Sequence, residues 1–425
     1  MRVLFISVNT EQVNMPTLPL GLACVATSTQ RSGHLVRLIN LASKEGCYEV
    51  LKKSIGAFHP DVVGISVRNI DDQLRVGTKF LLDQVKEVVT ACRSLTGAPV
   101  VLGGAGYSIY PESVLAYLGA DMGINGEGET AFPTLLDYLE RGIDPSAIPG
   151  LCLPGRGITV AGRFTKNLDE LPFPDEPLWL SSDMMKQADV WVPVQTRRGC
   201  PMDCSYCSTA AIEGRTRRAH TPAAVVAMIE RHVRAGFERF YFTDNTFNIP
   251  SSYAAELCAR ILTAGLKISW MCILYPWKTE EALVRDMARS GCREVSLGFE
   301  SGNEGMLARM NKKFSLQDVR STSLLLKRYG IRQTGFLLLG GPGETRSSVE
   351  ESLAFADSLP LDTVKVTAGI RIYPHTALAQ QAVEEGIISP DDNLLYPRFY
   401  LAQELEGWLD ETVSQWMSTR PHWIR

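Results

Sequence analysis

Short apolar runs alternate with amphipathic stretches through the first part of the chain. The four clearest runs are VLFISV (3–8), LVRLIN (35–40), DVVGIS (61–66) and PVVLGG (99–104). A shorter run, MGIN, follows at 122–125, and helical periodicity fills the intervals between the runs. Strands that are apolar at nearly every position and alternate with helices are typical of a parallel sheet covered on both faces. The pattern therefore predicts an α/β, doubly wound domain over residues 1–144, whose ligand should lie beyond the carboxyl ends of the strands.

Proline interrupts this alternation. At 425 residues the chain is too long for one ordinary domain, so a boundary is expected. Residues 145–189 include the segment LPFPDEP at 171–177, and a proline-rich stretch of this kind resists regular structure. We interpret 145–189 as a linker between two domains.

The strand–helix alternation resumes in the second half. Its six apolar runs lie at 194–199, 239–243, 268–274, 294–299, 333–339 and 364–370. Six strand–helix units are too few for a closed eight-unit barrel, so an open, TIM-like partial (β/α)6 barrel is expected over residues 190–385. Residues 386–425 carry Trp408, Trp416 and Trp423 around a short amphipathic pattern, and we interpret them as a C-terminal cap on the barrel.

Composition and charge narrow the class of protein. Hydrophobic residues make up 45% and charged residues 21%, which is ordinary for a globular chain. The net charge of −4 and a pI near 6.0 argue against a nucleic-acid-binding surface, which is usually basic. No apolar run approaches the roughly 20 residues that span a bilayer, and the start MRVLFISV lacks the pattern of a signal peptide. We therefore expect a cytoplasmic protein with no membrane or nucleic-acid partner.

Three of the ten cysteines are clustered, and the others are dispersed like small buried hydrophobes in a reducing compartment. The segment RRGCPMDCSYCS (197–208) places Cys200, Cys204 and Cys207 at spacings of three and two intervening residues, directly after a predicted strand. Thiolates are the natural ligands of iron–sulfur clusters, and three ligands on a four-iron cluster leave one iron open for chemistry. Zinc is the alternative, but it usually takes four protein ligands, and the nearest histidine, His220, is isolated. The loop therefore predicts a [4Fe–4S] cluster.

With the aromatic Tyr206 just before its last cysteine, this loop resembles the defining motif of the radical S-adenosylmethionine (radical SAM) superfamily. The resemblance implies that the open iron chelates the amino and carboxylate groups of the methionine part of S-adenosylmethionine. An electron from the reduced cluster then cleaves the sulfonium and yields a 5′-deoxyadenosyl radical. An external one-electron reductant of the flavodoxin or ferredoxin type is implied as a partner.

Three further segments resemble superfamily motifs in order and spacing: FTDNTFN (242–248), SLGFESG (296–302) and GFLLLGGPGET (335–345). The S-adenosylmethionine contacts that this implies are Tyr206, Thr243, Asp244, Asn245, Glu300 and Leu338. Each motif alone has a simpler interpretation. A carboxylate at a strand end is more often a solvated or paired charge, and the glycines at 340, 341 and 343 are compatible with a tight turn.

The first domain resembles the cobalamin-binding domain that precedes many radical SAM enzymes. The resemblance lies in PLGLACVATSTQRSGHLVRLIN (19–40), PDVVGISVRNIDD (60–72), VVLGGAGYS (100–108) and INGEGET (124–130). The cobalamin contacts that it implies are Ser66, Val67, Arg68, Asn69, Gly103, Gly104, Ala105, Gly126, Glu127 and Gly128. Many such domains carry Asp-x-His-x-x-Gly, whose histidine ligates cobalt from below, and this chain has no such triplet. The resemblance thus implies cobalamin with no histidine underneath, and Arg68 is our candidate for the lower face of the corrin. Alternatively, the fold is an empty one used for packing or dimerisation, or it binds another small ligand.

Two cofactors imply a division of labour, with the radical abstracting hydrogen and methylcobalamin delivering a methyl group to carbon, or to phosphorus in some relatives. A cobalamin-dependent methyltransferase is our first hypothesis. A cyclase or rearrangement enzyme without methyl transfer is the second, and a non-catalytic cobalamin-binding or electron-transfer protein is the third. No second cysteine cluster follows the barrel, which favours a small-molecule substrate such as a natural-product intermediate over a protein. The segment GIRIYPHTAL (369–378) resembles a motif with Pro-Gly-Thr, and its candidate substrate contacts are Arg371, Tyr373 and His375.

Overall fold

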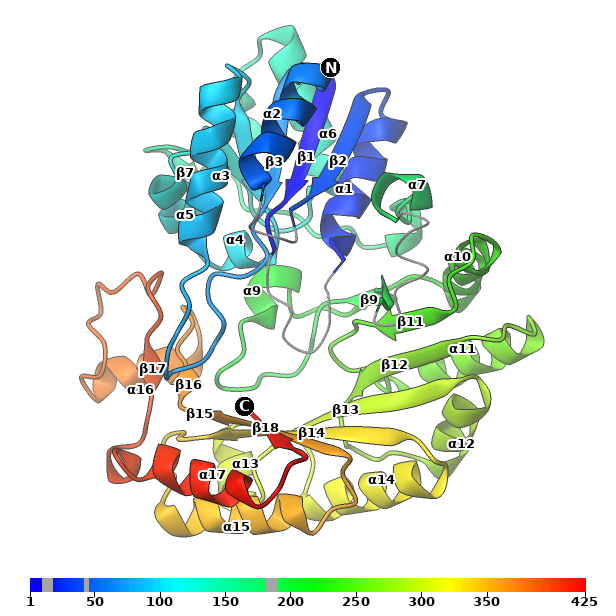
Figure 1. The fold of residues 1–425 in the computed structure, drawn as a ribbon, viewed down its shortest axis with the longest axis vertical. Helices are drawn as coiled ribbons and strands as arrows, with labels where there is room; N and C mark the ends of the chain where they lie inside the picture. Colours follow the sequence, from blue (N-terminus) through cyan, green and yellow to red (C-terminus); the bar gives the residue numbers. More distant parts are fainter. Residues whose placement is uncertain (10–17, 42–45, 181–189) are drawn as a thin grey trace. The chain divides into compact units, whose positions relative to one another are not determined.

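The structure is a computed structural model that describes residues 1–9, 18–41, 46–180 and 190–425. The chain forms two compact units (Figure 1). Unit 1 comprises Met1–Asp72, Thr78–Val190 and Thr209–Gly214, and unit 2 comprises Gln73–Gly77, Trp191–Ser208 and Arg215–Arg425. Within the described ranges, no helix has both the length and the apolar character that a membrane crossing requires.

Unit 1 is built on a seven-stranded sheet with the order β2-β1-β3-β4-β5-β6-β7. Its parallel strands are β1 (Arg2–Ser7), β2 (Leu35–Asn40), β3 (Val62–Ser66), β4 (Val100–Gly103) and β5 (Met122–Ile124). Its helices include α1 (Leu20–Arg31), α2 (Cys47–Phe58), α3 (Leu82–Leu95), α4 (Ala105–Ile109), α5 (Pro111–Leu118) and α6 (Gly128–Arg141). Helix α1 packs against α6, whereas α2 and α5 pack against α3, so two groups of helices cover the sheet. The prediction of a doubly wound α/β domain is confirmed.

The apolar runs of the central strands form the core of this unit because β1, β3 and β5 are buried at nearly every position, whereas the edge strand β2 is only half-buried. Val3 and Phe5 of β1 are at most 1% exposed, and they pack with Phe132 and Leu135 of α6. The rings of Phe5 and Phe132 lie 5.0 Å apart between centroids. Such packing explains why the strands of unit 1 are apolar without alternation.

The expectation that 145–189 has no regular structure is wrong for its first part. Strand β6 (Leu151–Leu153) pairs antiparallel with β5, and β7 (Gly157–Ile158) pairs antiparallel with β6, so the segment extends the sheet of unit 1. The short run LCL is buried and completes the core. The remaining elements are η1 (Pro145–Ala147), η2 (Leu168–Glu170) and α7 (Glu176–Trp179). Residues 181–189 of the expected linker lie outside the described residues.

Unit 2 is built on a second seven-stranded sheet, and all its strands are parallel, in the order β18-β15-β14-β13-β12-β11-β8. These strands are β8 (Val192–Val194), β11 (Arg239–Phe242), β12 (Ser269–Leu274), β13 (Cys292–Glu300), β14 (Arg332–Leu339), β15 (Thr363–Ala368) and β18 (Trp423–Ile424). The main helices are α10 (Pro222–Arg234), α11 (Ser251–Thr263), α12 (Glu281–Arg289), α13 (Glu304–Arg309), α14 (Leu316–Arg328), α15 (Arg346–Asp357), α16 (Ala377–Glu384) and α17 (Leu409–Ser418). Small elements are β9 (Arg197–Arg198), β10 (Arg218–Ala219), β16 (Ile370–Arg371), β17 (Phe399–Tyr400) and η3 (Gln403–Leu405), whereas α9 (Thr209–Glu213), between β9 and β10 in the chain, belongs to unit 1. Because β8 and β18 are separate edges, the barrel is open, as predicted.

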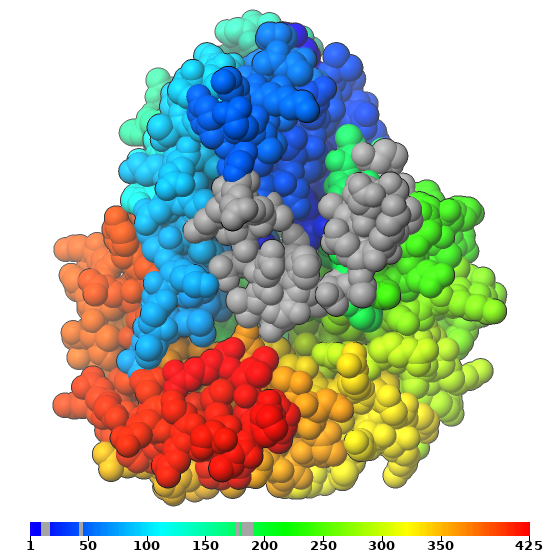
Figure 2. Space-filling model, viewed as in Figure 1, coloured from blue at the N-terminus to red at the C-terminus, as the bar shows by residue number. Residues whose placement is uncertain are grey.

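The C-terminal segment does more than cover the barrel. Its last residues form β18, which adds a seventh parallel strand beside β15, with Trp423 opposite Val364. The Trp423 side chain is 3% exposed and lies 6.2 Å from the ring of Trp416 on α17. Arg420 pairs with Asp357 of α15, and the C-terminal residues, red in Figure 2, form part of the surface of unit 2. A two-residue strand is too short to be recognised from hydrophobic pattern.

The strands of unit 2 bury one face fully and the other only in part. On β14, Gly335, Leu337 and Leu339 are buried, whereas Thr334 and Leu338 are half-buried. The buried face packs on the helices of the outer layer (Figure 1), as where the Phe299 ring of β13 meets the Phe355 ring of α15 at 6.0 Å. The half-buried face is therefore the inner face of the open barrel. A side-chain-filled barrel would bury both faces, whereas the side chains on this inner face stay partly exposed.

Candidate functional site

Residues 200–207, the cysteine loop, follow β8 and β9 at the start of the open barrel. Cys200 is 8% exposed, and Cys204 and Cys207 are half-buried. The Cys207 amide donates to the Cys204 carbonyl at 3.2 Å, and the Cys204 thiol interacts electrostatically with the other two thiols. Burial raises the pKa of the Cys204 thiol to about 11, so a metal that binds there must displace its proton.

The donor set of this loop fits an iron–sulfur cluster better than a single ion. In the described part of the chain, no three histidine, cysteine, aspartate or glutamate side chains, those of the loop included, are grouped closely enough to hold one metal ion. His220 is buried, and its amide bonds to the Thr196 carbonyl at 2.9 Å. A four-iron cluster offers a different iron to each thiolate, so three thiols in one loop match its chemistry without a fourth protein ligand.

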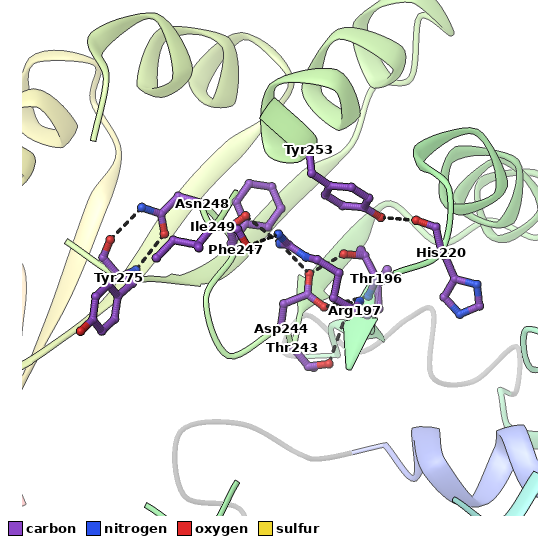
Figure 3. Close-up of polar contacts among 11 residues, drawn as sticks. Thr196, Arg197, His220, Thr243, Asp244, Phe247, Asn248, Ile249, Tyr253 and Tyr275 are labelled. Carbon is purple, nitrogen blue, oxygen red and sulfur yellow. Dashed lines mark hydrogen bonds and ion pairs between the residues drawn. The ribbon is translucent and has the colours of Figure 1, made fainter. Parts of the chain in front are cut away.

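A buried ion pair fixes the chain just before the cysteine loop. Asp244 lies two residues beyond β11 and is 2% exposed, and its carboxylate receives the Arg197 guanidinium at 3.2 Å (Figure 3). The same carboxylate accepts the amides of Thr196 and Arg197 at 2.8 and 2.9 Å and the Thr196 hydroxyl at 2.6 Å. All these bonds tie β9 to the end of β11. Asp244 is thus a positioning residue for the cysteine loop.

The two carboxylate oxygens of Asp244 are already engaged by four donors of the protein, and its predicted contact with S-adenosylmethionine stays a prediction. Arg197, which the sequence did not single out, continues the clamp by donating to the carbonyls of Phe247 and Ile249 at 2.7 and 2.9 Å. Its guanidinium also lies 4.6 Å from the ring centre of Tyr253 (Figure 3). The turn after β11 and the start of the cysteine loop therefore form one rigid substructure.

The segment after α13 holds the cysteine loop from another side. Three consecutive residues contact it: the Met310 carbonyl accepts the Ser205 amide at 3.2 Å, and Asn311 donates to the Asp203 carbonyl at 2.6 Å. Lys312 Nζ donates to Tyr206 Oη at 2.9 Å and lies 3.3 Å from Glu300 Oε1. Lys312 is another residue that the sequence did not single out. It links Tyr206 of the cysteine loop to Glu300 at the end of β13.

The other predicted S-adenosylmethionine contacts lie in unit 2. Glu300 adopts a left-handed backbone with φ 66° and its side chain is 16% exposed. Thr243 is half-buried and its amide donates to the Val194 carbonyl at 2.9 Å, while Asn245 is half-buried in the same turn. Leu338 lies on the inner face of β14. These side chains all follow or line strands of unit 2 near their carboxyl ends.

The turn after β14 is held by its own glutamate. Glu344 is 1% exposed, and Oε2 accepts the amides of Gly340 and Gly341, whereas Oε1 is buried and has no hydrogen-bond partner within the described ranges. Gly340 has φ 101° and Gly343 has φ 69°, so glycine is needed at both positions for backbone reasons. The tight-turn interpretation of these glycines thus has a physical basis.

Burial raises the pKa of Glu344 from 4.5 to about 7. Between these values the folded state keeps a proton that the unfolded state has released, so stability falls as the pH rises through this window. At about 1.4 kcal/mol per pKa unit, the loss reaches roughly 3 kcal/mol. We expect Glu344→Gln to remove this slope, so that the variant gains stability relative to the wild type between pH 5 and 8. Urea unfolding at a series of pH values, followed by tryptophan fluorescence, measures the free energy of unfolding. The exposed Glu350→Gln is the control and should keep the pH dependence of the wild type. Parallel pH profiles for the wild type and Glu344→Gln would contradict the assignment.

The predicted cobalamin contacts lie along one edge of the sheet in unit 1, where β3, β4 and β5 end. A small hollow that opens to solvent lies at this edge. It is lined by Val8, Asn9, Ser66, Arg68, Asn69, Leu81 and Val85. Arg68 is exposed, and Asn69 donates to Asn9 at 3.4 Å. Val67 is 1% exposed, and only its backbone is at the edge, where its carbonyl accepts the amides of residues 106 and 107.

Gly103, the last residue of β4, and Gly104, which follows it, have different roles. A Cβ on Gly104 would lie 2.6 Å from the Val67 carbonyl oxygen, and Gly104 has φ 103°. Glycine at this position therefore allows the turn after β4 to pack closely against the residues after β3. Its contact with cobalamin stays a prediction. A Cβ on Gly103 would meet nothing closer than 3.9 Å, so this position leaves space.

The turn after β5 is partly occupied by protein contacts. The Gly126 amide donates to Ser108 Oγ at 2.9 Å, and Glu127 accepts the Thr165 amide at 2.8 Å. Gly128 packs against Val25, where a Cβ would lie 2.9 Å from a methyl carbon. Ala105 is half-buried at the start of α4. The carboxylate of Glu127 thus holds residue 165, and its contact with cobalamin stays a prediction.

Arg371, one of the predicted substrate contacts, is engaged by the protein itself. Arg371 is 4% exposed and donates to the carbonyls of Ile372 at 2.7 Å and Leu394 at 2.9 Å, so it holds the segment before β17. Tyr373 is half-buried, with the Arg371 guanidinium 5.2 Å from its ring centre. His375 is exposed and has φ 59°, so it adopts the left-handed conformation that glycine would supply. The turn is kept despite the departure from Pro-Gly-Thr.

A different cation lies on the inner face of the barrel. Lys365 is half-buried on β15, on the same face as Thr363 and in register with Phe336 of β14. Burial lowers the pKa of its ammonium group. Among the described residues, no hydrogen-bond or ion-pair partner accompanies Lys365. An unpaired lysine on this face is suited to an anionic ligand group.

Comparison with known proteins agrees with this geometry. The model of the radical SAM superfamily matches residues 194–356, and the model of the B12 binding domain matches residues 6–136. An uncharacterized methyltransferase of Pyrococcus horikoshii is 28% identical over 403 residues, which cover 93% of this chain and 85% of that protein. Tryptophan 2-C-methyltransferase of Streptomyces laurentii is 24% identical over 443 residues, with 89% and 74% covered.

Among solved structures, the radical S-adenosylmethionine methyltransferase TsrM from Kitasatospora setae, with cobalamin and a [4Fe–4S] cluster bound, is similar with a TM-score of 0.89. The match covers 100% of this chain and 92% of that chain at 20% sequence identity. At this identity the likeness establishes the arrangement of elements in each unit.

Proposed function

Since this chain belongs to the cobalamin-dependent radical SAM enzymes, we propose that it is a methyltransferase acting on a carbon or phosphorus centre of a small molecule. Within this family the bound [4Fe–4S] cluster supplies the electron that cleaves S-adenosylmethionine, and methylcobalamin supplies the methyl group. The observation that carries the proposal is the cysteine loop, held on one side by Asp244 and on another by Lys312. The methyltransferase names of the similar proteins support the reaction class.

Each part of the site has a proposed role in this reaction. Cys200, Cys204 and Cys207 hold the cluster, and Tyr206 and Glu300 border the place of S-adenosylmethionine together with Thr243, Asn245 and Leu338. The half-buried inner face of the barrel binds the substrate and excludes water from the reacting carbon. Lys365 replaces Arg371 as our candidate for an anionic group of the substrate. An external one-electron reductant of the flavodoxin or ferredoxin type is the proposed partner.

The proposed cobalamin site is the edge of unit 1 around the hollow with Ser66, Arg68 and Asn69. The chain carries no Asp-x-His-x-x-Gly motif, and Arg68 is exposed at the place proposed for the lower face of the corrin. A cation there disfavours binding of a further axial ligand to cobalt. We expect Arg68→Ala to change the visible absorption spectrum of bound cobalamin, whereas the exposed Arg141→Ala on α6 should leave it unchanged. Identical spectra and turnover for wild type and Arg68→Ala would exclude this role.

The reaction class is tested by following a label from S-adenosylmethionine that carries a labelled methyl group. Anaerobically reconstituted enzyme with cobalamin, a reductant and candidate substrates is expected to place the label in a product. Carboxylate- or phosphate-bearing candidates should be preferred over their neutral analogues, and this preference should be lost in Lys365→Met. Turnover without label in the product would favour cyclisation or rearrangement instead. A complete lack of 5′-deoxyadenosine would favour the non-catalytic, cobalamin-binding alternative.

A further inference from the structure

Lys312 lies between Tyr206 and Glu300, beside the proposed cluster site. Its side chain is only 4% exposed, and its ammonium group lies 2.9 Å from Tyr206 Oη and 3.3 Å from Glu300 Oε1. The ammonium also lies 5.3 Å from the ring centre of Tyr206 and 5.9 Å from that of Phe314. Since a buried ammonium is costly to desolvate, its charge requires compensation. Glu300 supplies that compensation.

A tyrosine hydroxyl can be held by any neutral hydrogen-bonding group, so positioning Tyr206 does not by itself call for a buried charge. The charge acts on the cysteine loop as well. Tyr206 lies between Cys204 and Cys207 in this loop, and its hydroxyl accepts from Lys312 Nζ at 2.9 Å, so the ammonium lies beside the residues proposed to hold the cluster. Asn311, the neighbour of Lys312, donates to the Asp203 carbonyl at 2.6 Å and keeps this segment against the loop, and Glu300 brings a negative charge to 3.3 Å from the ammonium.

We propose that Lys312 and Glu300 act as an opposed pair of charges that sets the reduction potential of the cluster on the cysteine loop. This inference rests on the proposed function. Reduction adds one electron, delivered by the one-electron reductant, to the cluster and forms or breaks no bond. A positive charge nearby stabilises the reduced state, which is more negative, and a negative charge destabilises it. Lys312 is thus a positioning residue for Tyr206 that also makes the cluster easier to reduce, while Glu300 makes it harder.

The experiment measures the midpoint potential of the reconstituted cluster in the full chain, without S-adenosylmethionine, by a redox titration followed by electron paramagnetic resonance. Lys312→Met is expected to shift the potential to more negative values, and Glu300→Gln to more positive values. The double variant should return close to the wild type because both charges are gone. The exposed neighbour provides the matched control: Lys313→Met also removes one lysine and should leave the potential unchanged.

Opposite shifts separate a charge effect from a disturbed fold, which would move both single variants in the same direction. Shifts of the same sign, or shifts no larger than that of Lys313→Met, overturn the inference. If Lys312→Met fails to hold a cluster, two other variants test the inference. Lys312→Arg must keep the midpoint potential of the wild type, and Glu300→Gln must raise it. A wild-type chain that binds no iron overturns the proposed function as well, whereas a normal cluster with unresponsive potentials overturns this inference alone.

Discussion

The variant with Cys200, Cys204 and Cys207 all replaced by alanine is expected to hold no [4Fe–4S] cluster and to form no 5′-deoxyadenosine, while both units remain folded. The loop supplies every thiolate that the proposed site offers, and no other group of metal-ligating side chains in the described ranges can substitute for it. Iron and sulfide content and the resonance signal of the reduced cluster, measured after anaerobic reconstitution, report the loss. Each single replacement should abolish the signal or reduce it severely, because two thiolates hold a cluster poorly.

Cys47→Ala is the matched control, since this half-buried cysteine lies on α2 in unit 1, outside the cysteine loop. It should reconstitute like the wild type. Iron and sulfide bound equally well by the triple variant would remove the basis for the assignment of the cluster.

Asp244→Ala is expected to lower the free energy of unfolding of unit 2 by about 3–5 kcal/mol, because it leaves the Arg197 guanidinium buried without its carboxylate. The two side chains are 4% and 2% exposed, so water cannot replace the lost partner. The change also frees the amides of Thr196 and Arg197, which precede the cysteine loop. We therefore expect reduced cluster occupancy together with reduced stability.

Tryptophan fluorescence during urea unfolding suits this measurement, because all but one of the seven tryptophans lie in unit 2. The control is Arg215→Ala, which breaks the ion pair between Arg215 and Asp203 at the same loop. Both partners there are 63% exposed, and an exposed pair contributes less than about 1 kcal/mol. Equal losses for the two variants would show that the buried pair has no special role.

Periodicity predicted the main strands of both sheets except β8, which was expected at 194–199 and lies at Val192–Val194. The runs at 239–243, 268–274 and 333–339 coincide within a residue with β11, β12 and β14. The elements that were missed are short: β6, β7 and β18 have two or three residues each, so they show no period. Their positions depend on pairing with a strand that already exists, and the hydrophobic pattern of a short segment does not record its partner.

In the candidate site, too, local features could be predicted from the sequence, whereas contacts between distant residues could not. Local motifs indicated the cysteine loop and the strand ends, but they did not indicate the partner of each polar side chain. Asp244 pairs with Arg197, 47 positions earlier, and Lys312 bonds to Tyr206, 106 positions earlier. Arg371 likewise bonds to the carbonyl of Leu394, which only the folded chain brings near. Whether a charged side chain meets a ligand or the protein itself is decided by such distant pairs, and a single sequence does not display them.

The boundary between the units has a practical consequence for protein dissection. Residues 209–214, which include α9, belong to unit 1, where α9 packs on α4, although they follow the cysteine loop in the chain. Residues 73–77 belong to unit 2, where Arg75 packs against Gly369 and pairs with Asp410, although they come from the first half of the chain. If the gene were divided once, near codon 190, each of the two fragments would lack a short segment that packs within its own unit. To study the two units as separate proteins, residues 209–214 would have to be joined to the N-terminal fragment and residues 73–77 to the C-terminal fragment.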